Sequence, residues 1–161
     1  MWPHAGYWPT GPGVYAFCRT AEQVPGQPVH FYLCLVMSLV SEFNDYRQRM
    51  NEKIMAADNK VIKRFFNLDT NTYQEGALNV KTKEMLGLAC SMVLRCDDCI
   101  KYHLGKCYEE GINDEEIYEV FAIANLIGGS IVIPHFRRAV EYWEALKEEA
   151  AVAAPPHSHD A

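Results

Sequence analysis

The chain has 161 residues, which is enough for one domain with tails and a sizeable buried core. Hydrophobic residues make up 49% and charged residues 22%, as is usual for soluble globular proteins. The net charge of −6, with acids and bases interleaved, lacks the basic stripe that nucleic-acid binding requires. We therefore expect small molecules or further copies of the chain as partners, and no nucleic acid.

Residues 1–36 differ in composition from everything that follows. They hold five of the eight prolines and four glycines, without apolar periodicity, and such a stretch cannot readily propagate a helix or a strand. Two readings are open: a poorly ordered natural extension, or residues translated upstream of a true start at Met37. We favour the second, because helical patterning begins immediately after Met37, and Cys18 and Cys34 then carry no function.

From Ser38 onward the pattern is helical. Apolar residues recur at three- and four-residue steps from Val40 to Ile54, which predicts a first amphipathic helix. Asp58 is expected to cap a second helix, and Thr82 a third helix with apolar residues facing inward.

A fourth helix is expected to carry the cysteine-rich stretch and to end at Gly111, a suitable residue just past a helix C-terminus. Asn113 and Glu116 have the spacing of a capping box at the start of a long apolar helix. A last amphipathic helix follows Gly128-Gly129. We find no alternating strand pattern and predict an all-α domain over residues 37–150, with a flexible tail at 151–161.

Two apolar runs have the hydropathy of a membrane span or an export signal over part of their length. Residues 31–40 are too short and lack the basic flank and cleavage pattern of a signal peptide. The run 117–133 contains Glu119 and Asn125 and falls short of the roughly 20 apolar residues of a membrane span. We expect a deeply buried helix there, no membrane association, and a reducing, cytoplasmic compartment with available thiols.

The stretch CDDCIKYHLGKC holds the candidate chemistry. On a helix, Cys96 and Cys99 share one face, and a small adjustment at a helix N-terminus would allow a disulfide. Free N–H groups in a first turn favour a thiolate, whereas Asp97 and Asp98 place opposing negative charge beside the thiols. His103 follows Cys99 by four residues on the same face and could relay the thiol proton.

A zinc site is the competing interpretation of this stretch. Cys96, Cys99 and His103 supply three ligands, but a structural zinc site needs four, and one straight helix cannot easily arrange them tetrahedrally. Cys90 and Cys107 lie among apolar neighbours and are expected to be small buried hydrophobic residues.

The spacing from Glu84 through Cys96 and Cys99 to His103 resembles the E-x11-C-x-x-C-x3-H signature of AhpD-like alkylhydroperoxidases, within the carboxymuconolactone decarboxylase superfamily. Residues 76–129 resemble the core of that family, and the flanking helices are compatible with it. Some members carry a histidine immediately before the second cysteine, where this chain has Asp98.

The resemblance implies an AhpD-like helical bundle that assembles into trimers or hexamers, and a thiol peroxidase that needs no flavin, haem or metal. Cys99 would attack a hydroperoxide, Cys96 would form a disulfide with it, and Glu84 and His103 would move protons. An external dithiol, thioredoxin-like or lipoyl, would reduce the disulfide. The alternatives are a lyase like the carboxymuconolactone decarboxylases and a non-catalytic zinc-binding or assembly module.

Overall fold

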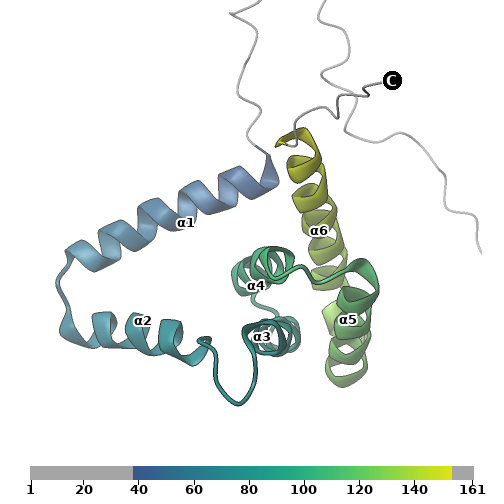
Figure 1. Cartoon of the computed structure of the whole chain (residues 1–161), viewed down its shortest axis with the longest axis horizontal. Helices are drawn as coiled ribbons and strands as arrows, with labels where there is room; N and C mark the ends of the chain where they lie inside the picture. Colours follow the sequence, from purple (N-terminus) through teal and green to yellow (C-terminus); the bar gives the residue numbers. More distant parts are fainter. Residues whose placement is uncertain (1–37, 154–161) are drawn as a thin grey trace, which may run out of the picture. The chain divides into compact units, whose positions relative to one another are not determined.

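The structure is a computed structural model that describes residues 38–153. Those residues form six α-helices and one short 3-10 helix, and no strand occurs among them (Figure 1). The elements are α1 (Leu39–Ala56), α2 (Lys60–Thr72), α3 (Val80–Leu94), α4 (Asp97–Glu109), α5 (Asp114–Gly128), η2 (Ser130–Val132) and α6 (Ile133–Ala153). The predicted all-α fold is confirmed.

The predictions for the two ends of the chain concern mostly residues that the structure does not describe. The proposed extension 1–36, with Cys18 and Cys34, lies outside the described residues, and so does most of the proposed tail. Helix α6 continues to Ala153.

Two helices begin at residues other than those predicted. Asn59, not Asp58, caps α2, and its side chain accepts hydrogen bonds from the first turn. Asp58 instead has a positive φ of 51° and pairs with Lys63. Asn79 caps α3 and accepts from the backbone N–H of Thr82 at 2.8 Å. Asparagine caps as well as aspartate and better than threonine, so the cap lies one residue later than expected in α2 and three residues earlier in α3.

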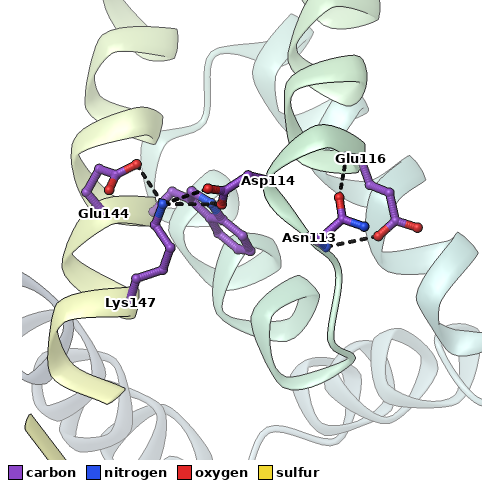
Figure 2. A network of polar contacts seen from close by, with 6 residues as sticks. Asn113, Asp114, Glu116, Glu144 and Lys147 are labelled. Atoms are coloured by element: carbon purple, nitrogen blue, oxygen red, sulfur yellow. Dashed lines mark hydrogen bonds and ion pairs between the residues drawn. The ribbon is translucent and has the colours of Figure 1, made fainter. Parts of the chain in front are cut away.

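The turn between α4 and α5 follows the sequence prediction. Gly111 adopts a positive φ of 69° just after α4, a conformation that glycine accepts without steric cost. Asn113 and Glu116 then form the capping box at the start of α5, each side chain bonding to the other's backbone N–H (Figure 2). The two groups satisfy donors that the first turn would otherwise leave free.

A polar cluster joins α5 to α6. Asp114 accepts a hydrogen bond from the indole of buried Trp143 at 2.7 Å. It also forms an ion pair with Lys147 at 3.0 Å (Figure 2). The hydrogen bond from Trp143, followed by that from Lys147, lowers the pKa of Asp114. Glu144 also contacts Lys147, at 2.9 Å. The start of α5 is thereby held against the middle of α6.

The core lies where α3, α4, α5 and α6 meet. α3 contacts both α4 and α5, and α4 and α1 each contact α6 (Figure 1). The most buried large side chains come from these four helices and the 3-10 turn: Leu88, Met92, Ile100, Leu104, Ile117, Phe121, Val132 and Trp143. The two helices that carry the predicted site, α3 and α4, therefore pack directly against each other.

Several helices expose apolar side chains, α2 and α5 among them. The prediction of a deeply buried helix over 117–133 is wrong for one of its faces, since Leu126 is 86% and Ile127 70% exposed while Ile117 is fully buried. α2 has no buried residue, and its Val61 and Phe65 are exposed. A single bundle of this size has too few helices to cover every apolar face. No helix within residues 38–153 is long and apolar enough to cross a membrane.

Candidate active site

The cysteine pair lies at the start of α4. Cys96 is the N-cap residue, Cys99 sits in the first turn, and a disulfide joins them with their Cα atoms 5.3 Å apart. Arg95, in the left-handed conformation with φ 60°, ends α3 and turns the chain into this cap. Cys99 is exposed, whereas Cys96 is half-buried. The pair therefore presents one sulfur to solvent beside the free N–H groups of a helix N-terminus.

The two aspartates between the cysteines have different surroundings. Asp98 is exposed and lines the cavity described below. Asp97 is directed to α6, where it contacts His135 at 2.8 Å and Arg138 at 3.0 Å. Of the two acids expected to disfavour a thiolate, Asp97 therefore has its charge compensated by basic side chains of α6. The sequence motif contained no signal for His135 or Arg138, which lie about 40 residues further on.

A buried carboxylate–imidazole pair lies beside α4. Oε2 of Glu84, on α3, is 2.7 Å from Nδ1 of His103, on α4. Both side chains are almost fully buried, with 3% and 9% exposure. Sequence spacing alone could not place Glu84 near the cysteines, and the packing of α3 against α4 brings it next to His103. A carboxylate oxygen can only accept, so His103 Nδ1 carries the hydrogen and Nε2 is left as the acceptor in the neutral ring.

Tyr73 is a third member of this group that the sequence analysis missed. Its hydroxyl lies 3.4 Å from His103 Nε2, and the two rings are tilted with centroids 5.2 Å apart. Burial, followed by the charge of Glu84, raises the pKa of Tyr73, so its hydroxyl stays protonated and can donate to Nε2. Tyr73 follows α2 and has no motif spacing to the cysteines, so no signal in the sequence pointed to it.

Gly87 provides the space that this group occupies. A Cβ atom at that position would lie 2.5 Å from Cε1 of His103 and 2.7 Å from the hydroxyl of Tyr73. Gly87 is one turn after Glu84 on α3, on the face toward α4. A glycine inside a predicted helix costs stability and often marks a close approach, and this is the signal that could have singled out Gly87.

A cavity of about 310 Å³ opens beside Cys99 and His103. Its lining comes from α1, the end of α2 and the start of α4: Phe43, Tyr46, Arg47, Met50, Asn51, Asp69, Asp98, Cys99, Tyr102 and His103. Cys99 lines this cavity, whereas its disulfide partner Cys96 does not. The guanidinium of Arg47 lies 4.2 Å from the centroid of the Tyr102 ring. The cavity thus joins apolar side chains with a few charged ones next to one sulfur.

The remaining described cysteines differ from each other. Cys107 is fully buried, and burial raises the pKa of its thiol to about 12, which keeps it protonated and unreactive. Cys90 is exposed on α3, so the expectation that it is buried is wrong. Among residues 38–153, no group of three or more His, Cys, Asp or Glu side chains is arranged to hold a metal ion.

Solved structures of similar proteins share this fold. Two crystal structures of a Thermotoga maritima protein, TM1620, match with a TM-score of 0.67 and 54% and 53% identity, over 68% and 70% of this chain and 96% and 95% of that one. That protein is described as a carboxymuconolactone decarboxylase family protein with a suggested involvement in the antioxidative response. A Legionella pneumophila protein of the same family matches with a TM-score of 0.58 and 26% identity, over 68% of this chain and 95% of that one.

Sequence comparison leads to the same group of proteins. An uncharacterised protein of Cupriavidus necator is 30% identical over 73 residues, 45% of this chain and 65% of that protein, so the match spans just under two thirds of the relative. The model of the carboxymuconolactone decarboxylase family matches residues 59–142, which run from the start of α2 into α6 and include both cysteines and the Glu84–His103 pair. The chain belongs to the carboxymuconolactone decarboxylase family.

Proposed function

We propose that this protein is a thiol-dependent peroxidase that reduces organic hydroperoxides. One observation carries the proposal: the exposed Cys99 is paired with Cys96 in a disulfide, beside a cavity that also reaches His103 of a buried Glu84–His103 pair. A disulfide at a helix N-terminus, next to a group able to move protons, has the features of a redox-active pair rather than of a structural crosslink. The three-residue separation encloses too short a loop to stabilise the fold much.

Cys99 is the attacking residue in this scheme. After reduction of the disulfide, its thiolate attacks one peroxide oxygen, the O–O bond breaks, and the other oxygen leaves as an alkoxide that takes up a proton. The products are a sulfenic acid on Cys99 and an alcohol. Cys99 takes this role because it lines the cavity where a hydroperoxide would bind, while Cys96 does not.

His103 and Glu84 move the proton. Nε2 of His103 accepts the proton of the Cys99 thiol, either through the hydroxyl of Tyr73 that donates to it or directly once that hydroxyl turns away, and returns it to the leaving alkoxide. Glu84 accepts the Nδ1 hydrogen, which fixes the orientation of the ring and stabilises its positive charge while it holds the extra proton. Burial of both groups keeps the interaction from being screened by water.

Cys96 resolves the intermediate. Its thiol displaces hydroxide from the sulfenic acid of Cys99, which forms the disulfide and releases water. An external dithiol then reduces the disulfide by two exchange steps and is itself oxidised to a disulfide, so that the cycle consumes one hydroperoxide and one dithiol. The exposure of Cys99 makes it the sulfur that the incoming dithiol reaches first.

The comparisons support this proposal in a general way. The family includes AhpD-like proteins, and the Thermotoga maritima relative carries a suggested antioxidative role. The cavity has Phe43 and Met50 on one side, which favours a hydroperoxide with an apolar organic group over hydrogen peroxide.

The family name also suggests a second candidate function, that of a lyase. A decarboxylase acting on a lactone acid has no use for an oxidisable cysteine pair, so it would keep its activity when Cys96 is replaced by Ser. Release of carbon dioxide from a lactone acid, unaffected by that replacement, would favour the lyase.

A test separates attack from resolution. The fully reduced Cys96→Ser variant is treated with one equivalent of cumene hydroperoxide and a probe for sulfenic acids, and the adduct is located by mass spectrometry. We expect the adduct on Cys99. Cys99→Ser should give none at low peroxide concentration, and Cys90→Ser, which removes another exposed thiol, should behave as the parent chain. An adduct on Cys96 in Cys99→Ser, formed at the parent rate, would reverse the two roles.

A further inference from the structure

A second polar cluster connects the cysteine motif to α6. Asp97, the residue after Cys96, lies with Oδ1 2.8 Å from Nδ1 of His135 and with Oδ2 3.0 Å from Nη2 of Arg138. His135 and Arg138 stand three residues apart near the start of α6, on one side of that helix. One carboxylate between the two cysteines is thus held by two basic side chains from a helix about 40 residues away in sequence.

The hydrogen bonds in this cluster can be assigned. Nη2 of Arg138 is also 2.9 Å from Nδ1 of His135, yet one Nδ1 cannot donate to Asp97 and accept from Arg138 together. An Nδ1 without hydrogen would place its lone pair against a carboxylate oxygen at 2.8 Å, which is unfavourable. We therefore assign the hydrogen to Nδ1 of His135, which donates it to Asp97. Arg138 and His135 are then close to each other without a hydrogen bond between them.

The charge of Asp97 bears directly on the cysteines. An uncompensated carboxylate beside a thiol disfavours the thiolate, and Asp97 flanks Cys96 and is two residues from Cys99. Burial would raise the pKa of Asp97, but the hydrogen bonds from His135 and Arg138 and the positive charge of Arg138 lower it overall. Asp97 is thus ionised, with its charge offset on the α6 side. The other acid of the motif, Asp98, faces the cavity instead.

We propose that His135 and Arg138 are positioning residues of the redox pair: they hold the Asp97 carboxylate toward α6 and offset its charge, so that reduced Cys99 remains reactive as a thiolate. The inference rests on the proposed redox role of the Cys96–Cys99 pair, but it does not depend on which oxidant the protein uses. It also explains how the motif tolerates two acids between its cysteines. One of the two is compensated from α6.

The test is a double-mutant cycle on the reduced, full-length chain. The rate of Cys99 alkylation by iodoacetamide is followed against pH by mass spectrometry in Arg138→Gln, Asp97→Asn and the double variant. In Arg138→Gln we expect the midpoint of the profile to rise by roughly half to one pH unit, because the Asp97 carboxylate, two residues from Cys99, is no longer held on the α6 side. The alkylation rate at neutral pH should fall roughly three- to tenfold, as that midpoint shift implies.

The coupling identifies the mechanism. In the Asp97→Asn background, Arg138→Gln should change the alkylation rate by less than about twofold, because no carboxylate is left that could turn from α6 toward the cysteines. Arg137→Gln removes the same charge from the neighbouring position, where it has no contact with Asp97 among those the structure describes, and should leave the profile unchanged. An equal shift in both backgrounds, or none in Arg138→Gln, would overturn the proposal.

A second variant, His135→Gln, keeps the test decisive if Arg138→Gln does not fold. His135→Gln keeps Arg138, and its effect should also disappear in the Asp97→Asn background; circular dichroism checks that each variant is helical. If Arg138→Gln proves unstable, the His135→Gln cycle decides, and an uncoupled effect there counts against the proposal. Because no peroxide enters this assay, coupling without peroxide turnover would refute the peroxidase while leaving the role of His135 and Arg138 intact.

Discussion

Gly87→Ala tests the packing on which the proton-moving group depends. The new Cβ atom would stand 2.5 Å from Cε1 and 2.8 Å from Nδ1 of His103, and 2.7 Å from the hydroxyl of Tyr73. Carbon atoms in ordinary contact lie about 3.5–4.0 Å apart, so the imidazole must move by about 1 Å. His103 is held by Glu84 at 2.7 Å and is buried, so it cannot move without weakening that bond.

The magnitude follows from two opposing terms. Alanine is favoured over glycine inside a helix by about 1 kcal/mol, whereas overpacking a filled site costs about 1–3 kcal/mol. We expect Gly87→Ala to be destabilised by about 1 kcal/mol in urea unfolding. Peroxide reduction should fall roughly 100-fold, because a displacement of about 1 Å of a catalytic group has an effect of that size.

A matched control is available on the neighbouring helix. Gly105 lies within α4, and a Cβ atom there would meet nothing within 4 Å. Gly105→Ala should therefore raise the free energy of unfolding by about 0.5–1 kcal/mol and leave the activity unchanged. If Gly87→Ala were as stable and as active as Gly105→Ala, the close packing of His103 against α3 and its part in the reaction would both be refuted.

Four further predictions concern the site, the N-terminal residues and the oligomeric state. Replacing Glu84 or His103 by Gln should slow steady-state hydroperoxide reduction at least roughly tenfold, and activity equal to the parent would remove their proposed role. Tyr73→Phe keeps the ring but loses the hydroxyl, and should lower the rate roughly threefold to tenfold and change its pH profile; an unchanged profile would make the hydroxyl incidental. A chain that begins at Met37 should melt as the full chain does, while a loss of several degrees would show that the removed residues are packed. Sedimentation should find a homo-oligomer, a trimer or hexamer, because α2 and α5 expose apolar faces, and a stable monomer at micromolar concentration would contradict this.

Much of the fold could be predicted because the helical signals in this chain are local. The apolar period, the capping box at Asn113 and the glycine at position 111 each depend on neighbouring residues only, and the structure has all three where the sequence indicated. The errors at Asp58 and Thr82 are also local, since a nearby asparagine competes for the cap equally well with aspartate and better than threonine.

The site could be predicted only where its residues share one helix. Cys96, Cys99 and His103 come from a single segment, so their spacing alone indicated a cluster. Glu84 joined them through the family resemblance. Tyr73 and Arg138 reach the site through the packing of other helices, and no spacing rule connects them to the cysteines.

Burial was the least predictable property. Cys90 and the outer face of α5 are apolar in sequence but exposed in the structure. An apolar pattern indicates that a helix face packs against something, but it does not identify the packing partner. The two aspartates of the motif show the same limit for charge, since adjacent residues of one helix face different neighbours.

Counting thiols before and after one equivalent of hydroperoxide tests the central claim most directly. The chain has six cysteines, and the fully reduced protein should show six reactive thiols after denaturation. One equivalent of cumene hydroperoxide, without any other oxidant, should reduce the count to four within seconds to minutes, with the Cys96–Cys99 disulfide identified by peptide mapping. A count that stays at six, or one that falls equally in the Cys99→Ser variant, would contradict a thiol peroxidase centred on Cys99.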